Sequence, residues 1–194
     1  MRMTINIKNM QKYAAKYDEQ HRGKDGEKTE KEMKTLLRNQ RYLKKEELKK
    51  IVGWKTRNRS VHYCEQNKSD KVIKITKHSF SVVNEKDRIE SLLGQKGGLR
   101  GVGYPVASTI LHFAFPKKYP IIDFRVLRSL WDMKKEDIRY DFRLWERYFN
   151  KVRGIGKKYR LPIRTVEKAF WKYDELKSGR SRTCRQQPRI MCSV

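Results

Sequence analysis

One stretch of the chain, from Gly97 to Asp123, joins residue types that could bind a phosphate to a carboxylate that could do chemistry. It begins with glycines on both sides of Val102, continues as an apolar segment, and ends on the carboxylate after a Tyr-Pro loop. Closely spaced glycines allow positive φ and let the backbone approach a ligand. The unpaired N–H groups at the start of the next helix attract phosphate. The stretch therefore indicates a phosphate-binding hairpin, with a tight interhelical turn that binds nothing as the alternative.

Asp123 has a structural interpretation as well as a catalytic one. It immediately precedes a predicted helix over 124–131, whose apolar face is formed by Val126, Leu127, Leu130 and Trp131. Aspartate is a preferred N-cap, and such a cap contributes about 1 kcal/mol. On spacing alone, Asp123 is a helix cap.

The cysteines offer little chemistry. The three residues Cys64, Cys184 and Cys192 are scattered and odd in number, which predicts neither a disulfide framework nor a four-thiolate cluster. Cys64 follows His62 by two positions, a spacing that brings the two side chains to one face on a strand but not on a helix. A Cys–His nucleophile is therefore the minor alternative.

The histidines and the other tryptophans are expected to be structural. His21, His62, His78 and His112 show no metal-ligand spacing, so no metal and no cofactor is expected. His112 lies within an apolar helix, without an acidic neighbour, and is expected to be packed rather than catalytic. Trp131, Trp145 and Trp171 stand at helical spacing among apolar residues, as core residues do.

The elements that must position these residues are predicted to be helices. Apolar residues recur at three-to-four spacing in the segments 5–17, 33–37, 42–52, 84–93, 105–115, 124–131, 140–149 and 161–173. A polar loop is expected from residue 23 to 32, and Gly53 and Gly94 are expected to end helices. The segment 69–80 could be a strand, because Ile73 and Ile75 alternate, but Asp70 as a possible cap favours a helix. The expected architecture is one all-α domain, residues 1–176, followed by a basic disordered tail, residues 177–194.

Composition limits the partners. The 194 residues carry 48 Lys and Arg against 22 Asp and Glu, a formal net charge of +26, and the pI is about 10.1. Such a charge is typical of nucleic-acid-binding proteins, with an anionic membrane surface as the other large partner. No apolar run approaches the roughly 20 residues that span a bilayer, and no secretory segment is recognisable. We expect a cytoplasmic, nucleoid-associated monomer that binds DNA and no membrane.

The central stretch resembles the helix–hairpin–helix DNA glycosylase superfamily, of which endonuclease III is the familiar member. The family pattern is L-P-G-V-G, then R-K-T-A or similar, an apolar helix, a loop and V-D-T-H-x-x-R. The corresponding residues here are Leu99-Arg100-Gly101-Val102-Gly103, Tyr104-Pro105-Val106-Ala107, and Ile122-Asp123-Phe124-Arg125 with Arg128. The interval between the hairpin and Asp123 is the family's. The match covers residues 98–128, and the same stretch also looks like a widespread group of uncharacterised bacterial proteins of this fold.

The resemblance implies roles for particular residues. Leu99, Arg100, Gly101, Val102 and Gly103 would hold the DNA backbone, and Asp123 would be the catalytic carboxylate that stabilises the sugar cation and activates water. The implied activity is removal of a damaged or modified base from duplex DNA. Tyr104 and Trp54 are candidates for stacking on the extruded base. Candidate phosphate contacts are Lys96, Arg57, Arg59 and Arg125.

The departures from the family pattern also matter. Members that cut the strand carry a lysine where this chain has Pro105, and proline has no side-chain amine. An enzyme without lyase activity is therefore expected, with Lys117 and Lys118 as distant substitutes. The family's iron–sulfur cysteines are absent, and Arg125 replaces a histidine. Two rival functions remain: a helix–hairpin–helix module that binds nucleic acid without catalysis, and a basic structural or ribosome-associated protein.

Overall fold

The computed structural model describes residues 6–183, most of which belong to helices. In chain order these are α1 (Ile7–His21), α2 (Asp25–Asn39), α3 (Lys45–Thr56), α4 (Val61–Glu65), α5 (Ser69–Ser81), α6 (Glu85–Glu90), the 3₁₀ turn η1 (Gly94–Lys96), α7 (Tyr104–Ala114), α8 (Phe124–Trp131), α9 (Phe142–Tyr159) and α10 (Ile163–Thr183). No strand is formed within residues 6–183, which confirms the predicted all-α class.

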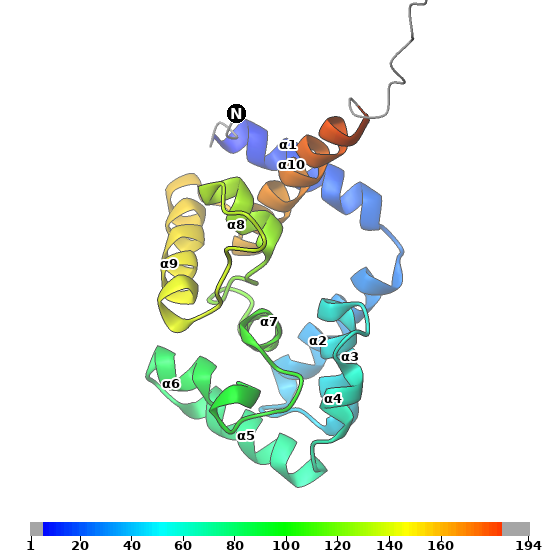
Figure 1. The fold of residues 1–194 in the computed structure, drawn as a ribbon, viewed down its shortest axis with the longest axis vertical. Coiled ribbons are helices and arrows are strands. Elements are labelled where there is room, and N and C mark those ends of the chain that lie inside the picture. Colours follow the sequence, from blue (N-terminus) through cyan, green and yellow to red (C-terminus); the bar gives the residue numbers. More distant parts are fainter. Residues whose placement is uncertain (1–5, 184–194) are drawn as a thin grey trace, which may run out of the picture.

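Helix α7 lies at the centre of the molecule (Figure 1). Its sequence is apolar on every side, and a helix of that kind is stable only when it is buried on every side. Its buried apolar side chains include Val106, Ala107, Ile110, Leu111 and Phe113. It contacts α2, α3 and α6, so the segment that follows the glycine-rich hairpin is fixed from several directions.

Two groups of helices surround α7. In one group, α10 packs along α1 and contacts α8 and α9; in the other, α3 contacts α2, α4 and α5, and α5 contacts α6 (Figure 1). Asp174 of α10 is almost fully buried and accepts hydrogen bonds from Arg125 and Arg128 of α8. These contacts fix the start of α8, and with it Asp123, against α10.

The connection between α6 and α7 forms a compact hairpin. Leu93 and Leu99 are fully buried and form an isolated parallel bridge, and Leu99 N–H donates to the Leu92 carbonyl at 3.1 Å. Gly94 N–H donates to the Val102 carbonyl at 2.9 Å. Buried leucines thus anchor the hairpin, in which Gly98 is buried, Gly101 is partly buried and Gly103 is exposed.

Several predicted boundaries were wrong. Gly53 does not end a helix, because α3 continues to Thr56 with Ile51 and Val52 buried beside the glycine. The expected loop 23–32 is short, since α2 already begins at Asp25. Helix α6 ends at Glu90 rather than at residue 93, because the leucines that follow it are used in the hairpin bridge.

The structure also shows which conformation the ambiguous segment 69–80 adopts and where the last helix ends. Residues 69–81 form α5, whose buried residues Val72, Thr76, Ser79 and Phe80 recur at helical spacing. Helix α10 continues to Thr183, so the boundary expected at residue 176 does not end the helix. The rest of the predicted tail lies outside the described residues.

Candidate functional site

A cleft of about 620 Å³ opens between the two groups of helices, and Asp123 lies in its wall. Its lining comes from five helices and includes Tyr17 and His21 of α1, Glu30 of α2, Trp54 and Lys55 of α3, Val126 of α8, and Arg164, Glu167 and Trp171 of α10. The volume is in the range of small-ligand sites. A predicted catalytic residue therefore lies in a cleft that could hold a nucleobase.

The two oxygens of Asp123 have different partners. Oδ1 accepts a hydrogen bond from the backbone N–H of Arg125 at 3.0 Å, which confirms the residue as the N-cap of α8. Oδ2 lies 2.9 Å from the ammonium nitrogen of Lys55. Burial raises the pKa of Asp123, but the Lys55 charge and the cap hydrogen bond outweigh it and hold the pKa below its usual range. The carboxylate is ionised, and a quarter of its side chain remains exposed in the cleft.

Lys55 is a residue of the site that sequence reasoning missed. It belongs to the last turn of α3, four positions after Ile51 and three after Val52, both of which are fully buried. That spacing places the lysine on the buried face of the helix, and its side chain is 9% exposed. The sequence does contain a signal for this residue, because Lys55 occupies a position of the helical pattern where an apolar residue is expected.

The floor of the cleft is a buried ion network. Arg164 donates to both carboxylate oxygens of Glu30, at 3.0 and 2.9 Å, and to Glu167 at 3.4 Å. Glu167 also accepts the backbone N–H of Ile121, two residues before Asp123. Burial raises the pKa of Glu167 to about 7 despite the Arg164 charge. This network ties α10 to the loop that carries the catalytic candidate.

The aromatic candidates separate into one that lines the cleft and one that does not. Trp54 lines the cleft, is partly buried, and donates its Nε1–H to the Gly26 carbonyl at 2.8 Å. Tyr104 is 3% exposed, its hydroxyl donates to Glu90, and it does not line the cleft, so its stacking on a base stays a prediction without support from this arrangement. Tyr17 and Trp171 contribute further rings to the cleft at 5.2 Å from each other.

The hairpin forms a second, more open hollow next to α4. Arg100, Gly101, Val102 and Gly103 line it together with Ser60, Tyr63 and Gln66. Asn67 fixes the hairpin: its Oδ1 accepts the Arg100 N–H at 2.9 Å, and its Nδ2 donates to the Arg100 carbonyl at 3.0 Å. Among the described residues, the backbone N–H groups of Gly101 and Gly103 have no hydrogen-bond acceptor. These two N–H groups are available to an anion.

The cleft and the hairpin hollow are separated by the connection between α3 and α4. Arg57 lines the cleft, whereas Ser60 lines the hollow. Arg57 and Asn58 both adopt positive φ, at 52° and 65°, which turns the chain sharply there. The sharp turn at Arg57 and Asn58 therefore lies between the cleft and the hairpin hollow.

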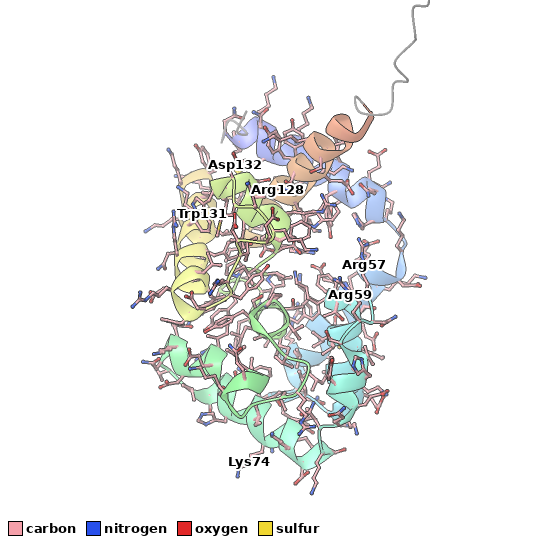
Figure 2. The ribbon with its side chains drawn as sticks, viewed as in Figure 1. Arg57, Arg59, Lys74, Arg128, Trp131 and Asp132 are labelled. Carbon is pink, nitrogen blue, oxygen red and sulfur yellow. The ribbon has the colours of Figure 1, made fainter. Side chains whose placement is uncertain are left out.

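The candidate phosphate contacts differ in availability. Arg57 and Arg59 are exposed and lie at the same edge of the molecule, beside α3 (Figure 2). Lys96 is about half exposed, with Glu90 at 4.0 Å. Arg125 pairs with Asp174 at 3.0 Å and lies over the Trp171 ring. Its contact with phosphate stays a prediction.

The remaining chemical candidates take structural positions. Cys64 and His62 belong to one helix, and burial raises the pKa of the Cys64 thiol to about 11, so the pair cannot supply a thiolate nucleophile. His112 is fully buried, and burial lowers its pKa to about 3, which confirms a packed neutral histidine. Trp145 is fully buried, while Trp131 and Trp171 pack against the core.

Residues 6–183 form neither a metal-ligand cluster nor a membrane-spanning helix. No group of three or more His, Cys, Asp or Glu side chains in this range could hold a metal ion. Within the same range, no helix is both long enough and apolar enough to cross a membrane.

Comparison with known proteins found no match. No family model matches the sequence, and no curated protein or solved structure shows significant similarity to it. The functional interpretation therefore depends on the geometry of the cleft and the hairpin.

Proposed function

We propose that the protein is a DNA N-glycosylase that excises a damaged or modified base from duplex DNA. The observation that carries the proposal is the position of Asp123. An ionised carboxylate stands in a base-sized cleft, at the start of a helix, and is held by Lys55 and by the Arg125 N–H. The net charge of +26 suits a polyanionic substrate.

The hairpin would bind the DNA backbone beside the target nucleotide. The unpaired N–H groups of Gly101 and Gly103 would donate to a phosphate, as backbone groups at helix starts do in other anion sites. Exposed arginines at 57 and 59 would neutralise neighbouring phosphates. These contacts position the duplex without reading its sequence.

The cleft would receive the extruded base. Extrusion costs a few kcal/mol, and stacking on aromatic rings offsets part of it. Trp54 lines the cleft on one side, and Tyr17 and Trp171 supply further rings. The cleft thus offers aromatic rings for stacking among side chains that are mostly charged or polar.

Cleavage of the N-glycosidic bond places positive charge on the sugar. The Asp123 carboxylate would stabilise that charge and orient or deprotonate the attacking water. Charge develops here as it does in glycoside hydrolysis. The products of this step are a free base and an abasic site.

The decisive experiment is base release from duplex oligonucleotides that carry a panel of alkylated, deaminated, oxidised and modified bases. We expect wild type to release one class of base. Asp123→Asn should abolish release, because the amide cannot offset the sugar charge, while its oxygen still caps α8. Each reaction is assayed with and without hot alkali, which cleaves at abasic sites.

Asp141→Asn is the matched control. Asp141 is also an N-cap, at the start of α9, where it accepts the Leu144 N–H at 2.8 Å, but it is exposed and outside the cleft. The same chemical change there should leave base release unaltered. Equal loss in both variants would contradict a specific role for Asp123.

A non-catalytic binding module is the second candidate function. It is favoured by one observation, that both oxygens of Asp123 already have structural partners in Arg125 and Lys55. This function predicts that Asp123→Asn binds duplex DNA as wild type does and that neither protein releases any base. The same assay, with a binding measurement beside it, separates the two functions.

A further inference from the structure

Tyr63 of α4 is an aromatic side chain at the surface. It is 52% exposed, and it is the one exposed Phe, Tyr or Trp residue within residues 6–183. Other tyrosines of the chain are buried and hydrogen-bonded through their hydroxyl groups, as Tyr148 is to the Ile121 carbonyl. The exposure of Tyr63 is therefore not explained by a role in the core.

The hairpin and α4 together fix the place of this ring. Val61 and Cys64 pack in or against the core, whereas Tyr63 lies on the exposed side of the helix. The hairpin backbone lies against the same helix, because a Cβ at Gly101 would be 3.0 Å from the Cys64 nitrogen. His62 lies beside the ring, with the two ring centroids 3.8 Å apart. Tyr63 thus lines the hairpin hollow, whose volume is about 550 Å³.

The other side chains of the hairpin hollow suit an anionic ligand. None of the described residues that line it is acidic, whereas Glu30, Asp123 and Glu167 line the cleft. The Arg100 guanidinium donates to the neutral Oε1 of Gln66 at 2.6 Å, a hydrogen bond that leaves its charge uncompensated. A cation beside an aromatic ring complements the two parts of a nucleotide, which are the anionic phosphate and the flat base.

Position distinguishes Tyr63 from the other exposed apolar residues. Single exposed apolar side chains are common on protein surfaces and need no explanation. Ile7 and Val83 are of this kind, because they line neither the cleft nor the hairpin hollow. Tyr63 instead shares its hollow with Arg100 and with the hairpin backbone. Its exposure therefore indicates a flat ligand that also carries negative charge.

We propose that the hairpin hollow binds an unpaired nucleotide of the DNA, with the base stacked on Tyr63. This proposal rests on the proposed function only in taking DNA as the partner and the hairpin as a contact to its backbone. It does not depend on Asp123 or on base excision. The ligand is a nucleotide outside the cleft, so the hollow and the cleft hold different parts of the same DNA.

Stacking on Tyr63 selects for the state of the DNA rather than for its sequence. In a fully paired duplex each base is already stacked between its neighbours, so a ring at the protein surface can stack only on a base that has left the pair. Stacking on an aromatic ring tolerates all sequences, because every base has a π face. The protein should therefore prefer duplex DNA that contains an unpaired stretch.

The test is fluorescence anisotropy at one salt concentration with three labelled DNAs. The first is a fully paired duplex, the second contains a central stretch of unpaired thymidines, and the third has base-free tetrahydrofuran residues in that stretch. We expect wild type to bind the second about tenfold more tightly than the first or the third, since stacking requires the bases. Tyr63→Ala should bind all three alike, whereas Tyr63→Phe should keep the preference because its ring still stacks.

Tyr42→Ala is the control, since it removes a partly exposed tyrosine that lies outside the hairpin hollow, and it should keep the preference. Equal wild-type affinity for the three DNAs overturns the proposal, as does a Tyr63→Ala loss of equal size on all of them. The base-release assay on paired lesion duplexes is a separate readout. A preference for unpaired bases without any base release would support this proposal and refute the glycosylase, and release without that preference would do the reverse.

Discussion

At the scale of single residues, the site depends on how burial and charge oppose each other. Asp123 stays ionised because Lys55 and the Arg125 N–H outweigh its burial, whereas Glu167 does not, although it contacts Arg164. Burial is the largest cause of the raised pKa of Glu167, and the Arg164 charge offsets it only in part, since Glu30 takes the two shorter hydrogen bonds of that arginine. Two carboxylates in one cleft thus have pKa values shifted in opposite directions.

The raised pKa of Glu167 predicts a pH-dependent stability. Its pKa rises from the usual 4.5 to about 7 on folding, so between these values the folded protein binds a proton that the unfolded chain has released. The free energy of unfolding therefore falls as pH rises through this window. Glu167→Gln has no proton to lose and should gain on the order of 2 kcal/mol relative to wild type between pH 5 and pH 7.

Urea denaturation of both proteins at pH 5, 6 and 7 measures this change. Glu30→Gln is the contrasting variant, because it removes the bidentate partner of Arg164 and should cost stability at all three pH values. A difference between Glu167→Gln and wild type that does not vary with pH would show that Glu167 is already ionised at pH 5.

At the scale of elements, the hairpin depends on a close fit to α4. Gly101 has φ +80°, and a Cβ at this position would lie 2.9 Å from the Ser60 carbonyl oxygen and 3.0 Å from the Cys64 nitrogen. Only glycine at position 101 therefore lets the hairpin backbone pack this closely against α4. This contact fixes the hairpin N–H groups relative to the α3–α4 connection.

Gly101→Ala tests that fit. The positive φ costs an alanine about 1–2 kcal/mol, and the clash with α4 adds to this, so both stability and duplex affinity should fall. Gly97→Ala is the matched control, because Gly97 has φ +82° but no atom within 4 Å of its Cβ position. It should lose stability through backbone strain alone and retain duplex affinity, as measured by denaturation and by fluorescence anisotropy. Equal affinities for the two variants would argue against the hairpin as the binding element.

At the scale of the whole molecule, basic side chains lie on more than one side. The hairpin and the exposed Arg57 and Arg59 belong to the part of the molecule near α3 and α4, whereas α9 lies on the opposite side (Figures 1 and 2). All of these parts are basic, but only the first borders the cleft. The proposed function therefore requires that DNA contacts one side of a protein that is positive throughout.

The salt dependence of duplex binding measures this asymmetry. Each phosphate contact contributes about −0.9 to the slope of log affinity against log salt on B-DNA. Arg59→Ala should make the slope less steep by about that amount. Lys151→Ala removes an exposed charge from α9 and should leave the slope unchanged. A similar change in both variants would indicate binding through overall charge, as expected of a basic structural protein.

The sequence by itself determined the helical class, the cap at Asp123 and the burial of His112. Each of these depends on local pattern: apolar spacing, a preferred cap residue, and the position of a histidine within an apolar helix. The predicted helix ends were wrong where tertiary contacts overrode local signals. Gly53 is held inside α3 by packing, and the leucines after Glu90 form the hairpin bridge instead of a further helical turn.

Only the tertiary structure decided which side chains meet. Tyr104 follows the hairpin in sequence but turns into the core, and Arg125 follows Asp123 but pairs with Asp174 of α10. Lys55 stands 68 residues before Asp123 and contacts it directly. Local pattern fixes the face of a helix on which a residue lies, whereas packing between helices fixes what that face contacts. That is why the carboxylate was predictable from the sequence and its amine partner was not.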